Sequence, residues 1–140
     1  MIGARRCGII HSSGMDEHEP SREIHAVDVV VEGNVLTAKI VGTTVERHRA
    51  AVILEKTKEA IDLHAGDLSH VVVDFGDVNF INSSGLGACV QLARHAQDKG
   101  LKPIAYRLKD PMIKIFKTVK ADHIYRLVHT GIELTKVLEE

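Results

Sequence analysis

The fold of this 140-residue chain is decided by the stretch VVVDFGDVNFINSSGLG at residues 71–87. The stretch opens with an almost unbroken apolar run, residues 71–75, which is typical of a central strand buried on both faces. A loop follows, and small residues then open a helix that ends at Gly100, a residue suited to the position after a helix. The expected inner side of that helix carries Leu86, Cys89, Val90, Ala93 and Ala96.

Upstream of this unit, two β-branched runs at residues 27–31 and 35–41 flank Glu32-Gly33-Asn34. Gly-Asn can supply the positive φ of a two-residue turn, so the runs are predicted to form an antiparallel hairpin. Residues 44–63 are predicted to form a helix because apolar side chains recur there at helical spacing. That stripe consists of Ala50, Ile53, Leu54, Thr57 and Ile61.

Downstream, residues 103–108 indicate another strand, with proline tolerated at its start. Asp110 and Pro111 are predicted to open a helix as N-cap and first helical residue. Its apolar stripe is Met112, Ile115, Phe116 and Val119. Residues 124–128 and 132–139 are expected to form a last strand and a last helix. The predicted fold class is α/β, with a mixed central sheet (an edge hairpin plus parallel strands) covered by about four helices.

The first part of the chain has a different composition from the rest. Residues 1–24 are polar and turn-prone and carry no apolar period, so they are predicted to form a flexible N-terminal tail. Residues 25–140 are predicted to form a single domain. Cys7 and Cys89 are too far apart to form a metal or redox motif, which favours a reducing, cytoplasmic location. No secretory signal is expected at the N-terminus.

Composition argues against two classes of partner. Lys and Arg number 18 against 19 Asp and Glu, a net charge of −1, which disfavours binding of nucleic acid over the whole surface. The chain has no Trp, two Tyr and three Phe, which leaves few platforms for stacking on single strands. No apolar stretch approaches the ~20 residues of a membrane span. Neither direct nucleic-acid binding nor membrane insertion is expected.

Signatures of enzymes and cofactor sites are incomplete. Gly85-Leu86-Gly87 begins a dinucleotide-binding pattern, but Val90 stands at the third glycine position. A phosphate-binding loop is absent, and the serine pair lacks the preceding glycine of a nucleophile elbow. Asp74 follows a central strand as in a phospho-receiver domain, without the acidic pair that would hold Mg²⁺.

The nine histidines occur singly, and His64 falls in register with a core stripe, which favours a structural role. We therefore predict no metal, no cofactor and no catalytic residues.

Lysines and arginines are concentrated over residues 99–120, where Asp110 is the only acidic residue. Lys114, Lys117 and Lys120 lie opposite the apolar stripe of the predicted helix, where lysines are expected on a solvated face. That interpretation is preferred. A patch for an acidic partner is the alternative.

The most informative site is the segment Asn82-Ser83-Ser84-Gly85-Leu86-Gly87. Its simplest interpretation is a turn with a serine N-cap. A hydroxyl at a helix N-terminus is also well placed to carry a phosphate, because free N–H groups and the helix dipole favour negative charge there. Gly85 and Gly87 are small enough to let the backbone of a partner approach the serines.

Residues 71–87 strongly resemble the signature of STAS domains, the bacterial anti-sigma factor antagonists, and the resemblance extends over about residues 25–140. The family pattern is an apolar strand ending in Asp-Leu, a loop with Val and Phe, and Asp-Ser-Ser-Gly-Leu-Gly opening a helix. This chain has Asn82 where the family usually has aspartate, which removes one charge beside the serines.

The resemblance implies regulation of transcription by partner switching. The antagonist would bind an anti-sigma factor that is also a serine kinase, and so release a sigma factor. The kinase would phosphorylate Ser83, and a serine phosphatase would restore it. The implied interface comprises Asn82, Ser83, Ser84, Gly85, Leu86 and Gly87.

Two alternatives stay open at this point: a cytosolic STAS subunit of a lipid or solute transport system, and a small nucleotide-binding α/β protein or enzyme. A homodimer also stays open.

Overall fold

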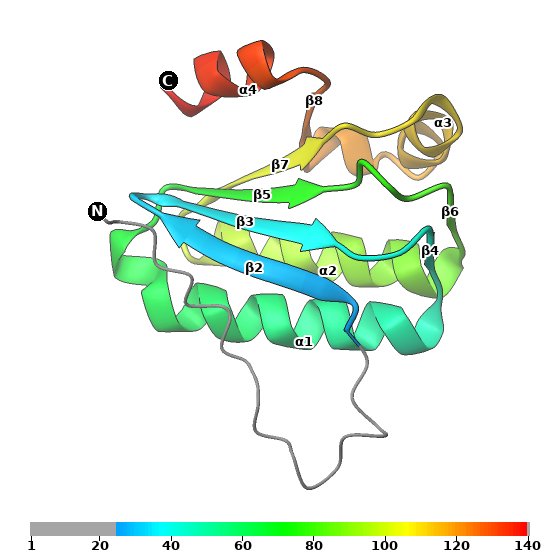
Figure 1. Cartoon of the computed structure of the whole chain (residues 1–140), viewed down its shortest axis with the longest axis horizontal. Coiled ribbons are helices and arrows are strands. Elements are labelled where there is room, and N and C mark those ends of the chain that lie inside the picture. The colour runs from blue at the N-terminus through cyan, green and yellow to red at the C-terminus, as the bar shows by residue number, and fades with distance from the viewer. Residues whose placement is uncertain (1–24, 140) are drawn as a thin grey trace, which may run out of the picture.

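The computed structural model describes residues 25–139. These residues form a five-stranded mixed sheet in the order β2-β3-β5-β7-β8 (Figure 1). The strands are β2 (Val27–Glu32), β3 (Val35–Ile40), β5 (His70–Asp74), β7 (Lys102–Tyr106) and β8 (Arg126–Val128). The mixed α/β architecture expected from the sequence is confirmed. The predicted tail, residues 1–24, lies outside the described residues.

The edge hairpin forms where the sequence places it. Strands β2 and β3 pair antiparallel, with Glu32 opposite Val35 across the two-residue turn. Gly33 has a φ of 60°, a conformation that costs glycine little because it has no Cβ. Every second residue of β2 is buried, as expected for a strand with one face on the core.

Strand β5 is the centre of the sheet. It pairs in parallel with β3 on one side and with β7 on the other, and β7 pairs in parallel with β8. All five residues of β5 are buried. The continuous apolar run that opens residues 71–87 therefore reflects a strand that is buried on both faces of the sheet.

Within residues 25–139, four helices surround the sheet, as Figure 1 shows. Helices α1 (Arg47–His64) and α2 (Ser83–Asp98) pack side by side on one face. Helix α4 (Gly131–Leu138) lies over the other face, and α3 (Asp110–Thr118) lies beside the end of β6. Two short 3₁₀ turns, η4 (Ala65–Asp67) and η5 (Ala121–His123), follow α1 and α3.

Two corrections concern helix starts. The predicted start at residue 44 is wrong because β4 (Thr44–Val45) forms a separate two-stranded parallel sheet with β6 (Phe80–Ile81). Asp110 is not the N-cap of α3. Lys109 takes that position in extended backbone conformation, and Asp110 is already helical.

The apolar stripes are mostly confirmed, with four exceptions. Val90 on α2, Leu54 on α1 and Ile115 on α3 are only partly buried against the core, whereas Leu92, which is not in the predicted stripe of α2, is buried. Val119 is 47% exposed because α3 ends at Thr118 and the chain then turns through Lys120 in the left-handed region.

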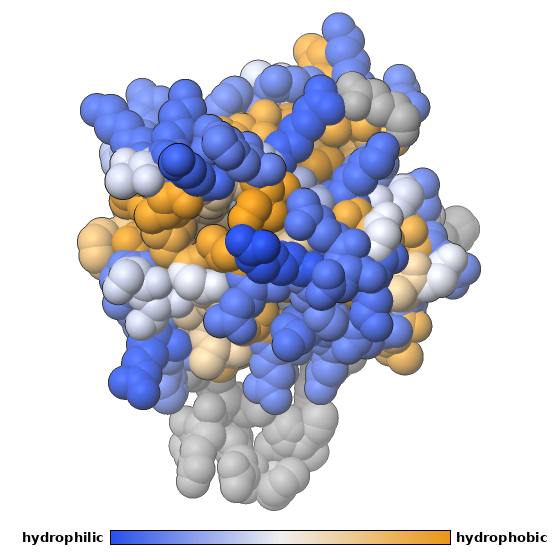
Figure 2. All heavy atoms as spheres, turned by 180° about the vertical axis from the view of Figure 1, so that it is seen from behind, coloured by the Kyte–Doolittle hydropathy of each residue, from blue (hydrophilic) through white to orange (hydrophobic). Residues whose placement is uncertain are grey.

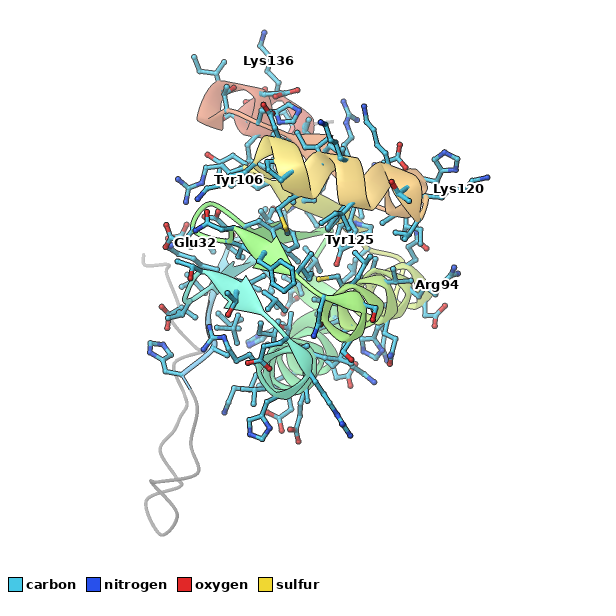
Figure 3. All side chains as sticks on the ribbon, turned by 90° about the vertical axis from the view of Figure 1, so that its right-hand side faces the viewer. Glu32, Arg94, Tyr106, Lys120, Tyr125 and Lys136 are labelled. Carbon is cyan, nitrogen blue, oxygen red and sulfur yellow. The ribbon has the colours of Figure 1, made fainter. Side chains whose placement is uncertain are left out.

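Aromatic residues join α3 to the core beneath α2. The ring of Phe116 lies 5.5 Å from that of Phe75 and 5.8 Å from that of Tyr125. The Tyr125 hydroxyl donates a 2.7 Å hydrogen bond to the carbonyl of Cys89 in α2. Figure 3 shows Tyr125 between the ribbons of α3 and α2. None of the described helices is both long and apolar enough to cross a membrane.

A candidate protein-binding site at the start of helix α2

The start of α2 is positioned by a chain segment some 40 residues upstream. The carbonyl of Thr43 accepts hydrogen bonds from the N–H groups of Asn79 (2.7 Å) and Phe80 (3.2 Å). The N–H of Asn82 donates to the carbonyl of Val45 at 3.2 Å. The connection from β3 to α1 therefore holds the loop that leads into the helix.

Asn82 is the N-cap of α2. Its backbone is extended, with a φ of −95°, and its side-chain Oδ1 accepts a 2.9 Å hydrogen bond from the N–H of Gly85. The expectation of a serine cap is therefore wrong. An amide caps a helix about as well as a carboxylate does, so the departure from the family's aspartate preserves the local structure.

The two serines occupy the first two helical positions, and both are exposed. Within residues 25–139, the N–H groups of Ser83 and Ser84 have no protein acceptor, as is usual in the first turn of a helix. A phosphate on either hydroxyl would meet unpaired donors and the positive end of the helix dipole.

The glycines beside the serines have different roles. Gly85 is buried, and a Cβ at that position would lie 2.5 Å from the carbonyl oxygen of Val45. Its lack of a side chain therefore serves packing within the domain and not the approach of a partner. Gly87 is exposed, and a Cβ there would meet no atom within 4 Å. Leu86 is 9% exposed and packs in the core.

The six residues of the expected interface thus divide in two. Asn82 is half-buried and Ser83, Ser84 and Gly87 are exposed, so a partner can reach these four. Gly85 and Leu86 are buried beneath these four residues. The structure brings all six together in one helical turn and its cap, and their role in binding stays a prediction.

Two helix N-termini lie next to each other at this edge. Strand β4 leads into α1 and β6 leads into α2, and the pairing of Val45 with Ile81 sets the caps Glu46 and Asn82 side by side. The Glu46 carboxylate accepts from the N–H groups of His48 (2.8 Å) and Arg49 (3.4 Å). The neutral Asn82 therefore avoids a second carboxylate beside that of Glu46.

An ion pair at the same edge of the sheet was not anticipated from the sequence. Arg107 donates to both carboxylate oxygens of Asp74, at 3.0 and 2.9 Å, and the N–H of Gly76 donates to the same carboxylate at 2.9 Å. The hydrogen bond to Asp74 raises the pKa of Arg107. Asp74 is thus engaged in an internal ion pair, and its side chain is only 10% exposed.

Further polar contacts hold the loop between β5 and β6. Lys39 lies 2.9 Å from Asp77, and this hydrogen bond lowers the pKa of Asp77. Lys109 donates a 2.6 Å hydrogen bond to Oδ1 of Asn79. No group of three or more metal-ligating side chains occurs among the described residues.

The chain belongs to the STAS domain family, whose family model matches residues 26–133. The fold expected from the resemblance is therefore confirmed.

Three solved structures show how widely this fold is used. A Thermotoga maritima protein, TM1081, named as a candidate anti-sigma factor antagonist, is similar with a TM-score of 0.68 at 13% identity, over 83% of this chain and 97% of that one. The Bacillus cell-fate determinant SpoIIAA in its phosphorylated form is similar with a TM-score of 0.63 at 18% identity, over 81% of this chain and 99% of that one. A sulfate transporter family protein from Wolinella succinogenes is similar with a TM-score of 0.58 at 13% identity, over 77% of this chain and 82% of that one.

Proposed function

We propose that this protein is an anti-sigma factor antagonist that acts by phosphorylation-controlled partner switching. In its unphosphorylated form it binds an anti-sigma factor that is also a serine kinase, and a sigma factor is thereby released. A serine phosphatase reverses the modification. The protein itself works by binding and catalyses no reaction.

The observation that carries this proposal is the exposure of Ser83 at the first position of a firmly capped helix. The cap is supplied by Asn82, so neither serine hydroxyl is needed to hold the helix. The fold is similar to that of SpoIIAA, a protein whose structure is solved in both a phosphorylated and an unphosphorylated form, and this similarity supports the assignment.

The effect of phosphate follows from its charge. A phosphoserine adds about −1.5 to −2 charge, which the helix N-terminus tolerates. At a close protein interface the same group must be desolvated or face acidic partner groups, at a cost of about 2–5 kcal/mol. That cost is enough to shift the protein from the bound to the free state.

Phosphopeptide mapping of the protein isolated from its own cells tests the proposal directly. We expect the phosphate on Ser83, its loss in Ser83→Ala, and its retention in the matched control Ser84→Ala. The kinase should co-purify with wild type and with Ser83→Ala, but poorly with Ser83→Asp. A phosphate confined to Ser84, or full binding by Ser83→Asp, would refute the assignment.

A second candidate function is supported by the similarity to the Wolinella transporter family protein. In that case the domain would be a subunit of a transport system. Co-purification with a membrane permease in place of a kinase-like ATPase would favour this function.

A further inference from the structure

Arg107, the residue that directly follows β7, has a backbone conformation that few residues with a side chain adopt. Its φ is 61°, in the left-handed region that favours glycine. Such a conformation persists only where the surrounding structure enforces it, and residues of this kind are concentrated at functional sites. The contacts of the Arg107 side chain show what enforces the conformation.

The guanidinium of Arg107 lies on the loop between β5 and β6. Its Nε and Nη2 atoms donate to the two carboxylate oxygens of Asp74, and its Cζ lies 5.3 Å from the centre of the Tyr106 ring. A Cβ on Gly76 would lie 2.5 Å from Cζ and 2.8 Å from Nε. The guanidinium therefore fills the space that a side chain at Gly76 would need. We call the contact of Arg107 with Asp74 and Gly76 the Arg107 clamp.

The short connection from β7 to α3, residues 106–109, holds the same loop at two further points. The carbonyl of Tyr106 accepts a 2.9 Å hydrogen bond from the N–H of Phe75, and Lys109 donates to the side chain of Asn79. Helix α3, which follows, buries its inner side chains in the core, while hydrophilic side chains cover its outer surface (Figure 2). The clamp is therefore attached to a helix that is anchored in the domain.

The clamped loop leads to the serines. Figure 1 shows the chain running from the end of β5 through β6 into α2. The clamp holds the first half of this segment. The carbonyls of Thr43 and Val45 hold the second half, through the N–H groups of Asn79, Phe80 and Asn82. A displacement of the first half is therefore transmitted along a few residues to the cap of α2.

We propose that Arg107 is a positioning residue for Ser83. Through the clamp it holds the β5–β6 loop against the end of β7, and the loop in turn sets where Asn82 and the serine after it lie. Position matters for transfer of a phosphate, because a misplacement of about 1 Å can cost about a hundredfold in rate. This inference rests on the proposed function in taking Ser83 to be the phosphate acceptor.

Two variants that lack the same guanidinium separate positioning from stability. Arg107→Ala removes the clamp and keeps a side chain in the left-handed region, whereas Arg107→Gly removes the clamp and relieves that strain. Arg107→Gly should therefore be the more stable of the two in urea denaturation. Both variants should release the loop to the same extent, because neither can contact Asp74 or Gly76.

The first measurement is amide hydrogen exchange of the ¹⁵N-labelled full chain. In both Arg107 variants, exchange at Phe80 and Asn82 should accelerate about tenfold or more relative to exchange at the buried Leu92 of α2. The amide signal of Ser83 should shift in both. Equal acceleration at Phe80 and Leu92 would mean that Arg107 only stabilises the fold, and would overturn the inference.

The matched control for charge is Arg94→Ala. Arg94 is exposed and points outward from α2 (Figure 3), so its loss should leave exchange at Phe80 and Asn82 unchanged. The same response in Arg94→Ala as in Arg107→Ala would contradict the inference.

Gly76→Ala breaks the clamp without changing the charge. The added methyl group would displace the guanidinium from Asp74, so this variant should reproduce the effects of Arg107→Ala at Phe80 and Asn82. Gly66→Ala is the control, because nothing lies within 4 Å of its added methyl group. Wild-type exchange in Gly76→Ala would count against the clamp.

The second measurement is the fraction of Ser83 that carries phosphate in protein isolated from its own cells. That fraction should fall about tenfold or more in Arg107→Ala, Arg107→Gly and Gly76→Ala, and stay unchanged in Arg94→Ala. Equal phosphorylation of wild type and Arg107→Gly would overturn the positioning role and leave Ser83 as the acceptor. Absence of phosphate from wild-type Ser83 would instead refute the proposed function. Hydrogen exchange needs no kinase and would then still decide whether Arg107 sets the position of the serine.

Discussion

The carbonyl oxygen of Val45 lies 2.5 Å from the point where a Cβ on residue 85 would stand. The side chains of Val45 and Ile81 also come within 3 Å of that point, so no side chain fits at Gly85 without displacing backbone. This close approach fixes the first turn of α2 against the segment that enters α1. The geometry of the proposed binding site therefore depends on a contact between residues 40 positions apart.

Gly85→Ala is expected to destabilise the domain by about 1–3 kcal/mol, the usual cost of overpacking a filled site. Gly87→Ala is the matched control in the same helix. Nothing lies within 4 Å of its added methyl group, so it should stabilise the domain by about 0.5–1 kcal/mol. Urea denaturation of both variants measures the two free energies of unfolding. Equal effects of the two substitutions would contradict the packing argument.

Asn82→Ala is expected to lower the free energy of unfolding by about 1 kcal/mol, because the N–H of Gly85 loses its acceptor. Asn82→Asp keeps an acceptor oxygen and should be nearly as stable as wild type, although its charge lies beside that of Glu46. Ser84→Ala should have little effect. A larger loss for Ser84→Ala than for Asn82→Ala would show that the serine, and not Asn82, caps the helix.

A charge at Ser83 should change stability in a direction set by its sign. Ser83→Asp places a carboxylate at the positive end of the α2 dipole and is expected to keep or raise the melting temperature, by about 0.3–1 kcal/mol in free energy. Ser83→Lys should destabilise by a similar amount. Thermal unfolding at low ionic strength checks both. A destabilised Ser83→Asp protein would mean that phosphate disturbs the fold as well as the interface.

Breaking the pair between Arg107 and Asp74 should cost more than breaking the pair between Lys39 and Asp77. Asp74 has a side chain only 10% exposed, so Arg107→Ala leaves a carboxylate with little water and one remaining donor, at a cost of about 1–3 kcal/mol. The Asp77 side chain is 59% exposed, so Lys39→Ala should leave the free energy of unfolding almost unchanged. Chemical denaturation of the two variants compares the pairs. Equal losses would show that burial of Asp74 is unimportant.

Stability should decline at alkaline pH because of Cys89. Burial raises the pKa of its thiol to about 12, against 9.0 for the exposed group. Above pH 9 the unfolded chain loses this proton while the folded chain keeps it, so the stabilisation present below pH 9 is lost as pH rises towards 12. The slope approaches about 1.4 kcal/mol per pH unit for one group.

Denaturation curves measured between pH 8 and 11 test this decline in stability, with Cys89→Ala as the comparison. The variant should be less stable at pH 8 because a buried side chain is truncated, but its decline with pH should be shallower. Parallel declines in the two proteins would contradict the assignment to Cys89. Tyr125, whose pKa is raised by burial and by the charge of the Cys89 thiolate, remains in both proteins, so the decline of Cys89→Ala should be shallower but not abolished.

The sequence by itself determined the elements whose signal lies within a few residues. The alternation in β2 and β3 with a Gly-Asn turn predicted the hairpin, and the apolar run at residues 71–75 predicted the central strand. The helix following Asn82 was predicted from the composition of the motif, and the family from its residues. Such patterns are local because backbone periodicity and turn conformation depend on adjacent side chains.

Only the tertiary structure decided how the site is held. The two-residue strands β4 and β6 are too short to show a period, and they exist because they pair with each other. The burial of Gly85 follows from that pairing, as does the position of the cap Asn82, which a serine could have occupied equally well on sequence grounds. The pair of Asp74, at the end of β5, and Arg107, just after β7, likewise joins two residues 33 positions apart. These contacts form between segments distant in the chain, so no local pattern encodes them, and packing alone brings them together.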